Sequence, residues 1–146
     1  DATNLWYTLD CGLLPLVGPK RTVGKNIRYA DPPTNPSDLA WLAGLLDGEG
    51  CFADWGAYPS QSGLRRHYPT IALAMTDSDV VERAANYFGS KVHCNAARPP
   101  ATKPTYRTTV NGAKAGKFML ALLPYMGQRR SAKINSVLMR WIGQQL

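Results

Sequence analysis

The repeated order of helical and strand-like segments is the feature that most restricts how this chain can fold. The patterns predict a helix, two strands, a second helix, two more strands and two final helices, over residues 37–47, 51–58, 67–75, 76–89, 91–98, 105–112, 113–127 and 129–146. A duplicated helix–strand–strand order lets the four strands pair into one antiparallel sheet with the helices packed on one face. We therefore expect an α+β fold whose other sheet face is open.

The first helix begins at a capping sequence that also marks a domain boundary. Asn35 can cap the helix, Pro36 suits its first turn, and Asp38 lies at the positive end of the helix dipole. The preceding stretch is rich in Pro, Gly and Asn. We therefore predict an irregular arm over residues 1–37 and one domain over residues 38–146, which is long enough to bury a hydrophobic core.

Charge is distributed unevenly along the chain. Residues 89–146 hold ten bases and no acid, whereas residues 39–88 are net acidic, within a total formal charge of +7. Solubility alone would not require a long basic segment without a single acid. Such a segment suits a polyanion. Nucleic acid is favoured over a membrane, because the sequence has neither a transmembrane-length apolar run nor an amphipathic membrane anchor.

The three cysteines, Cys11, Cys51 and Cys94, share no C-x-x-C spacing. An odd, scattered set argues against a disulfide framework and indicates a reducing intracellular compartment, such as a phage or bacterial cytoplasm or an organelle. His93 and Cys94 are neighbours but lack the further ligands of a zinc site, so we assign them a structural role.

The segment WLAGLLDGEGCF, residues 41–52, ends an apolar helix with two carboxylates, Asp47 and Glu49. Acids are unfavourable there, because the C-terminal end of a helix dipole is negative. We therefore expect a cap, a partner cation or a metal to compensate them. The Glu49 carboxylate and the free carbonyl of Gly48 are ligands that suit Mg²⁺, together with water and a substrate phosphate.

Small residues form a stripe along the same helix, because Ala40, Gly44 and Gly48 are spaced four residues apart. Such a stripe permits either packing within one chain or the close approach of a second copy of the helix. If two copies meet there, their acidic ends lie together at the base of a basic groove. Metal ions held by two such ends could activate water and stabilise a leaving oxygen at a phosphodiester.

The nine residues LAGLLDGEG, Leu42–Gly50, resemble the LAGLIDADG motif of homing endonucleases. Two downstream segments, LAMTDSDVVERAANYFG and LLPYMGQRRSAKI, resemble later segments of that family, so the resemblance extends over residues 38–142. It implies an αββαββα core with a four-stranded antiparallel saddle sheet and helices on one face. A single motif implies a homodimer that spans a near-palindromic site on double-stranded DNA. The implied activity is that of a mobile-intron endonuclease, which cleaves DNA site-specifically with Mg²⁺ or Mn²⁺.

The resemblance also implies residue roles. Glu49 matches the metal-binding acid, and Gly48 lies where a carbonyl contributes to the metal shell. Asp47 matches the first acid, which is mainly structural at the dimer seam. The basic residue that positions the active-site water network corresponds to Arg129 or Arg130.

Further candidates lie around this centre. Asp77 falls near a peripheral polar position of the active site, although it could equally cap the helix over residues 76–89. The outward residues of the strands are candidate base readers, namely Trp55, Tyr58, Arg65, Arg66, His67, Arg98, Lys103, Tyr106 and Arg107. A second basic set is more suited to the phosphate backbone and comprises Lys114, Lys117, Arg129, Arg130 and Lys133.

Other functions are compatible with the same pattern. One is a DNA-binding regulator that has lost cleavage, or a maturase that helps an intron RNA to fold. Another is a structural component of a ribonucleoprotein, for which the arm over residues 1–38 is the hint. The retained Glu49 favours the nuclease, because a protein that only binds gains little from a carboxylate beside phosphates.

Overall fold

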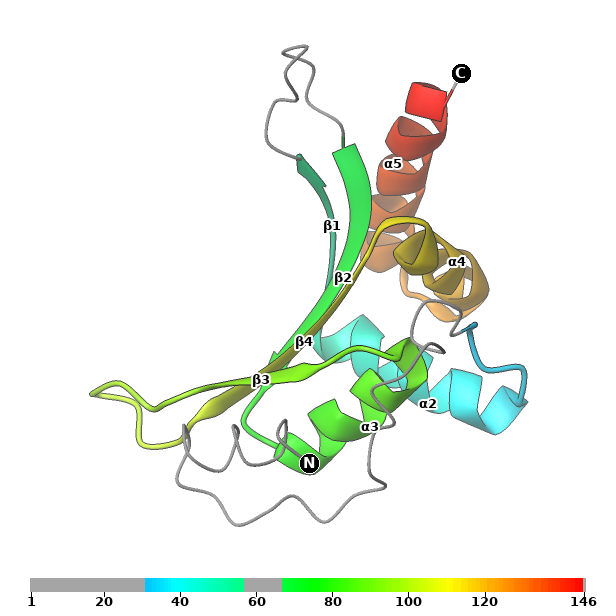
Figure 1. Ribbon diagram of the computed structural model, residues 1–146. Helices are drawn as coiled ribbons and strands as arrows, with labels where there is room; N and C mark the ends of the chain where they lie inside the picture. The colour runs from blue at the N-terminus through cyan, green and yellow to red at the C-terminus, as the bar shows by residue number, and fades with distance from the viewer. Residues whose placement is uncertain (1–30, 57–66, 146) are drawn as a thin grey trace. The chain divides into compact units, whose positions relative to one another are not determined.

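A computed structural model describes residues 31–56 and 67–145 of the chain. The elements are α2 (Pro36–Glu49), β1 (Gly50–Gly56), β2 (His67–Met75), α3 (Ser78–Phe88), β3 (Val92–Asn95), β4 (Thr105–Asn111), α4 (Gly112–Leu122), the 3₁₀ helix η2 (Leu123–Tyr125) and α5 (Gln128–Gln145) (Figure 1). This order confirms the duplicated helix–strand–strand pattern. Residues 1–30 of the predicted arm lie outside the described residues.

The four strands form one antiparallel sheet in the order β1-β2-β4-β3, so the predicted α+β fold is confirmed. In the register of β3 and β4, Cys94 pairs with Tyr106, and His93 pairs with Arg107. The first pair is buried, whereas His93 is exposed and Arg107 is half-exposed. The two strands therefore have one interior face and one open face.

The chain divides into two compact units, and its described residues fall into 73–109 in one unit and 31–72 with 110–145 in the other. We call these the α3 unit and the α5 unit. In the α3 unit, helix α3 packs on β3 and buries Val81, Ala84 and Phe88. Its ends follow the sequence signals, since Asp77 is the N-cap residue and Gly89 ends the helix in the left-handed region at φ 61°.

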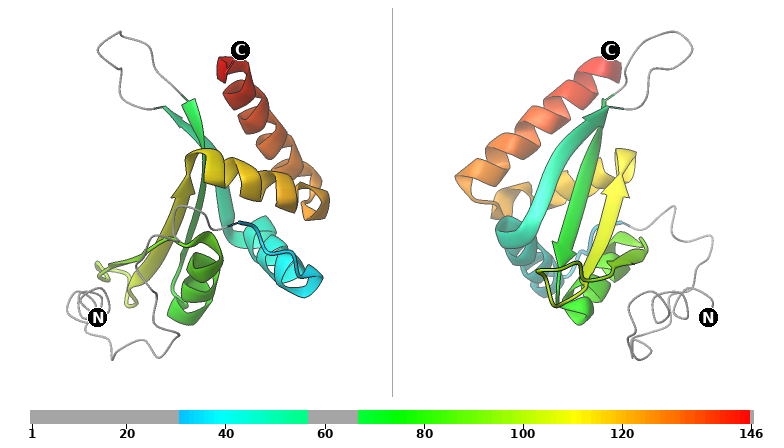
Figure 2. Two further views of the ribbon diagram at one scale, coloured as in Figure 1. Left: turned by 45° about the vertical axis from the view of Figure 1, so that its right-hand side comes forward. Right: turned by 90° about the vertical axis from the view of Figure 1, so that its left-hand side faces the viewer.

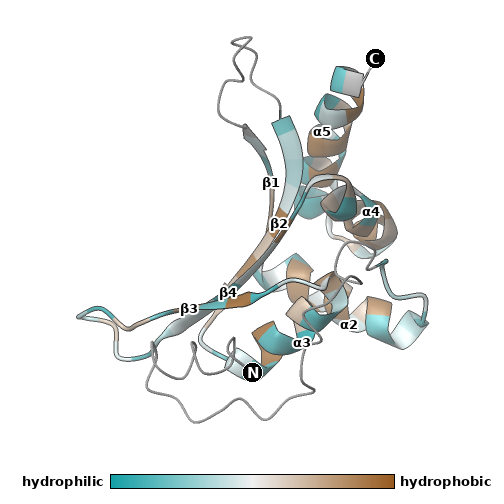
Figure 3. Cartoon of the chain, viewed as in Figure 1, coloured by the Kyte–Doolittle hydropathy of each residue, from teal (hydrophilic) through white to brown (hydrophobic). Residues whose placement is uncertain are grey.

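In the α5 unit, α5 lies along β1, and α2 contacts both β1 and α4 (Figure 2). Hydrophilic and hydrophobic residues alternate along α5, as expected for an amphipathic helix (Figure 3). Its apolar face buries Ile134, Val137 and Leu138. Trp141 continues this face, because a Cβ added to Gly116 of α4 would lie 3.0 Å from the Trp141 ring. Gly116 therefore provides the space that lets α4 and α5 approach closely.

The two cysteines among the described residues differ in state. Cys94 is disulfide-bonded and Cys51 is free and exposed, so the inference from cysteine spacing against disulfide bonding is wrong at Cys94. Cys94 is buried in β3. The irregular spacing of the cysteines in the sequence did not predict its disulfide bond. Among the described residues, no helix combines the length and apolarity that crossing a membrane requires.

Candidate active site and nucleic-acid interface

Helix α2 carries the two acids and begins as its sequence predicts. Asn35 Oδ1 accepts a hydrogen bond from the Ser37 amide at 2.8 Å, and Pro36 occupies the first turn. At the other end, a Cβ added to Gly50 would lie 2.7 Å from the carbonyl oxygen of Leu46. Glycine is therefore required where the helix passes directly into β1. This abrupt exit leaves Glu49 as the last helical residue, with an exposed side chain.

Asp47 caps the neighbouring helix. Its Oδ1 accepts a hydrogen bond from the Gly127 amide at 3.0 Å, and the Gly127 carbonyl accepts from the Ser131 amide at 2.9 Å. Gly127 thus immediately precedes the first turn of α5, which has 18 residues. A carboxylate is favourable at the positive end of a helix dipole. The favourable interaction of Asp47 with the start of α5 therefore compensates its unfavourable interaction with the negative end of the α2 dipole.

Arg130, in the first turn of α5, makes the reciprocal contact. Its Nε donates to the carbonyl of Asp47 at 3.1 Å, and its Nη2 donates to the carbonyl of Gly48 at 3.4 Å. These carbonyls lie in the last turn of α2, which contains no basic residue of its own. Arg130 supplies the missing cation and satisfies free helix carbonyls. Of the two candidate arginines, Arg130 bonds to the motif, whereas Arg129 is exposed.

The exposed end of α2 supplies a carboxylate from Glu49 and a carbonyl from Gly48. Within residues 31–56 and 67–145, no group of three or more His, Cys, Asp or Glu side chains could hold a metal ion. A Mg²⁺ site nevertheless needs few protein ligands, because water and substrate phosphates complete its octahedron. A carbonyl oxygen has two lone pairs, so Gly48 retains an acceptor site beside Arg130. These residues fit a divalent ion that is shared with a phosphodiester.

The small-residue stripe of α2 is open. Ala40, Gly44 and Gly48 are all exposed, and a Cβ added to either glycine would meet no atom within 4 Å. The buried side of the helix is formed instead by Leu42, Ala43 and Leu46. Packing within the described part of the chain therefore does not explain the stripe.

The open face of β1 presents Trp55, which is 42% exposed. Its neighbour Asp54 points to the other face, because Asp54 Oδ2 accepts a hydrogen bond from Arg140 of α5 at 3.0 Å. Trp55 therefore lies outward, as predicted. Three other candidates, Tyr58, Arg65 and Arg66, lie outside the described residues.

The expectation that His67 faces outward is wrong. Its Nδ1 lies 4.0 Å from Asp54 Oδ1, on the face that α5 covers. Burial along β2 does not distinguish the two sides of the strand, because Thr70 and Ala72 are buried as Ile71 and Leu73 are. The contact with Asp54 identifies the side on which His67 lies. Because successive side chains of a strand point to opposite faces, the half-exposed Tyr68 lies on the open face, although the sequence pattern does not predict it as a base reader.

In the α3 unit, the expectation that Tyr106 faces outward is also wrong. Tyr106 is 2% exposed and lies opposite the buried Cys94 in the strand register, and burial raises the pKa of the Tyr106 hydroxyl. Arg107, one residue later, lies on the open face opposite the exposed His93. Asn95 is exposed beside them. Strand parity counted from Arg107 would have identified both His93 and Asn95.

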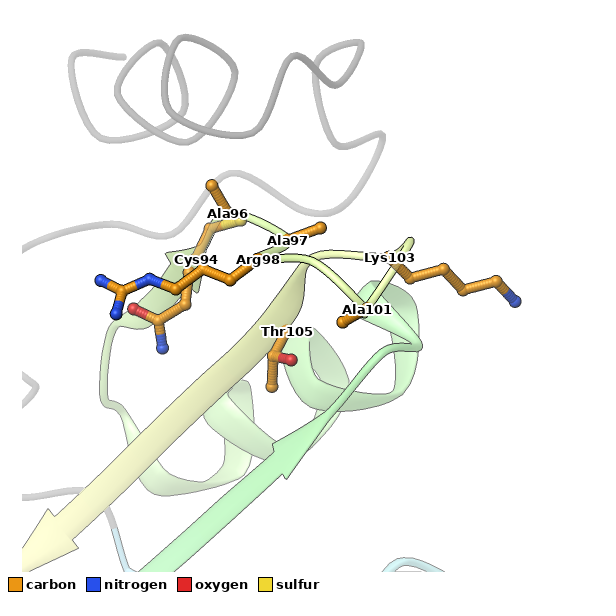
Figure 4. A pocket seen from close by; sticks show the side chains of 8 residues that line it. Cys94, Ala96, Ala97, Arg98, Ala101, Lys103 and Thr105 are labelled. Carbon is orange, nitrogen blue, oxygen red and sulfur yellow. The ribbon is translucent and has the colours of Figure 1, made fainter.

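Arg98 and Lys103 line a depression of about 640 Å³ formed by the β3–β4 connection. Both residues are exposed. Their charged groups extend away from each other, Arg98 toward one side and Lys103 toward the other (Figure 4). They therefore present two separate cations rather than one convergent anion site.

The remaining candidates are distributed over the helices. Lys114 in the first turn of α4 is half-buried, and this burial lowers its pKa. Lys117 forms an exposed ion pair with Asp31 at 3.3 Å, and Lys133 is exposed on α5. Asp77 is exposed at the N-cap of α3, where its side chain makes no capping hydrogen bond.

No protein-family description and no curated protein sequence matches this chain. Solved structures do. The meganuclease I-SmaMI bound to uncleavable DNA is 20% identical with a TM-score of 0.54, over 77% of this chain and 39% of that chain. The LAGLIDADG homing endonuclease I-GzeII in complex with its DNA target is 16% identical with a TM-score of 0.51, over 73% and 37%. The chain has the LAGLIDADG homing-endonuclease fold.

The LAGLIDADG-like segment, Leu42–Gly50, forms the second half of α2 and the first residue of β1. At these identities, the likeness establishes the fold. The chain spans little more than a third of the length of the two matched nucleases. The shared fold does not establish the chemistry of this site, which depends on the chain's own residues.

Proposed function

We propose that this chain is a site-specific double-stranded DNA endonuclease that requires Mg²⁺ or Mn²⁺ and acts as a homodimer. The observation that carries the proposal is the exposed Glu49 carboxylate beside the Gly48 carbonyl, at the end of the motif helix in a LAGLIDADG fold. I-SmaMI and I-GzeII, which share the fold, were both solved with DNA. A protein that only bound DNA would gain little from an acid at this position.

The chain's own residues hold the reacting groups in place. Glu49 and the Gly48 carbonyl would bind the metal ion, which when bound activates water and stabilises the leaving oxygen. Asp47 and Arg130 fix the end of α2 from which Glu49 projects, because Asp47 bonds to Gly127 just before α5 and Arg130 of α5 bonds to the carbonyl of Asp47. Arg129, exposed in the first turn of α5, is available to a phosphate.

The proposal of a homodimer is supported by the open stripe of Ala40, Gly44 and Gly48. Two copies of α2 that meet there can approach closely because glycine has no side chain. Each copy then brings one Glu49 to the seam. A two-fold arrangement places one acidic end near each DNA strand, as double-strand cleavage of a near-palindromic site requires.

The proposal of DNA binding is supported by the basic segment, residues 89–146, and by the open strand faces. Within the α3 unit, Arg107 lies on an open strand face, and Arg98 and Lys103 are exposed on the β3–β4 connection. Arginine can read guanine bidentately, and exposed lysines suit phosphates. Trp55 adds an aromatic surface on the open face of β1.

The test is cleavage of supercoiled plasmids that carry a randomised target library, with and without Mg²⁺. We expect metal-dependent cuts at selected sites. Glu49→Gln should lower the cleavage rate by at least about 100-fold while leaving DNA affinity within about twofold, since it removes a metal ligand and preserves shape. Asp79→Asn, which neutralises an exposed acid of α3, serves as the control and should cut normally.

The outcomes separate the alternatives. Specific DNA binding without any metal-dependent cut would replace the nuclease with a regulator. Preferential binding of structured intron RNA over duplex DNA would replace it with a maturase. Cleavage that survives Glu49→Gln would show that the acid at the end of α2 is not the metal ligand.

A further inference from the structure

Gln144, near the end of α5, binds both backbone groups of one strand residue. Its Oε1 accepts from the His67 amide at 2.8 Å, and its Nε2 donates to the His67 carbonyl at 2.9 Å. This two-point contact is what a neighbouring strand would provide. The start of β2 is therefore held by a helix side chain.

Arg140, one turn earlier on the same helix, holds β1. Its Nη1 donates to Asp54 Oδ2 at 3.0 Å, and the Asp54 side chain is only 21% exposed. His67 lies beside this pair, and its buried Nδ1 has no hydrogen-bond partner among the described residues. Asp54, His67, Arg140 and Gln144 thus form one cluster, which we call the α5 clamp.

The same helix holds the acidic end of α2. Arg130 in its first turn bonds to the carbonyls of Asp47 and Gly48, and Gln144 lies fourteen residues further along. At 1.5 Å per residue, the two contacts are about 21 Å apart along one continuous helix. Helix α5 therefore connects the candidate metal-binding end of α2 to the strand pair β1–β2, which carries Trp55.

We propose that Arg140 and Gln144 are positioning residues for DNA recognition, which hold the β1–β2 strand pair at a set place relative to the acidic end of α2. The inference rests on the proposed endonuclease function. Neither residue needs to touch DNA, because each acts through β1 or β2. Because α5 holds both the acidic end of α2 and the strand pair β1–β2, the clamp makes the position of the cut depend on the bases that the strand pair reads.

The first experiment measures amide hydrogen exchange at His67 in the protein without DNA. Gln144→Met keeps the side-chain volume but removes both hydrogen bonds, so exchange at His67 should accelerate by about tenfold or more. Gln144→Glu keeps an acceptor for the amide but loses the donor to the carbonyl, and should give an intermediate rate. Asn135→Leu, an exposed position on α5, is the control and should leave His67 unchanged.

The second experiment measures cleavage of the best site and of single-base variants of that site. In Gln144→Met, kcat on the best site should stay within about twofold, while discrimination against variants read by the strand pair falls about fivefold to tenfold. A structural defect alone would lower activity on all sites equally. The single variants Arg140→Asp and Asp54→Arg should each lose discrimination between sites. The double variant, which exchanges the two charges, should restore part of that discrimination.

Each failure has a distinct meaning. A wild-type protein that cuts no DNA overturns the proposed function, and the role of the clamp in DNA recognition with it. A wild type that cuts specifically, combined with unchanged discrimination in Gln144→Met, overturns the positioning role alone. Unchanged exchange at His67 would show that the two hydrogen bonds do not hold β2.

Discussion

Gly50 and Glu49 illustrate how a single residue shapes this site. Gly50 passes so close to Leu46 that no side chain fits. A Cβ added to Gly50 would lie 2.7 Å from the carbonyl oxygen of Leu46. The tight exit lets β1 start immediately after the helix, so Glu49 is left at the exposed end rather than in another turn. A glycine in the motif thus determines where the candidate metal-binding carboxylate lies.

Gly50→Ala should lower the free energy of unfolding by about 1–3 kcal/mol, because the added methyl group meets backbone atoms that cannot move aside cheaply. Chemical denaturation measures the change. Gly143→Ala is the matched control, since a Cβ there meets no atom within 4 Å and alanine favours a helix. Equal stability of Gly50→Ala and wild type would contradict the close contact.

At the scale of elements, the ends of α2 and α5 satisfy each other. The carboxylate of Asp47 from the end of α2 caps the start of α5, and the guanidinium of Arg130 from the start of α5 binds the final carbonyls of α2. Each charge lies at the dipole end that favours it. The junction stabilises both helices and orients the exposed acid beside it.

Arg130→Met should lower the free energy of unfolding by about 1–2 kcal/mol, because charge-assisted hydrogen bonds to two carbonyls are lost. It should also reduce cleavage, since the end of α2 is no longer held. Arg129→Met is the paired variant, and its exposure predicts little change in stability but weaker DNA binding. Denaturation and a DNA titration on both variants separate the two roles, and an equal loss of stability in both would contradict the assignment.

Gly44→Gln tests the open stripe of α2. The added side chain meets no neighbour within the described chain, so the folded protomer should tolerate it. At a helix–helix seam the same side chain would block close approach, and the dimer dissociation constant should rise at least about tenfold. Sedimentation equilibrium measures it, with Gly143→Gln as the control. An unchanged association state would remove α2 from the interface.

At the scale of the whole molecule, charge is segregated along the sequence. The acids that concern the site precede residue 89, and the ten bases of residues 89–146 follow without any acid. Some of these bases are already engaged within the protein, as Arg130 and Arg140 show. Exposed members such as Lys133 remain available to DNA phosphates.

Lys133→Gln should weaken DNA binding in a manner that depends on salt. Each phosphate contact contributes about 0.9 to the slope of log K against log salt concentration, so losing one contact should reduce that slope by about 0.9. Lys133→Arg keeps the charge and should retain the wild-type slope. Fluorescence anisotropy at several salt concentrations measures both, and an unchanged slope in Lys133→Gln would place Lys133 away from the DNA backbone.

The sequence by itself determined the order of elements and the fold. Hydrophobic period, capping residues and helix-ending glycines are local signals, so α2, α3 and the strands lie within a few residues of their predicted bounds. The LAGLIDADG-like motif then identified the fold that the solved structures share. Arg107 was among the residues expected to face outward, and it lies on the open face opposite His93.

Only the tertiary structure decided which polar side chains are engaged in contacts within the protein. His67 and Tyr106 are polar enough to suggest an open face, yet strand parity and packing place one beside Asp54 and the other in the interior. The choice between Arg129 and Arg130 depended on which one reached the carbonyls of α2, far away in the sequence. Such contacts join residues separated by some eighty positions, and no local pattern encodes them.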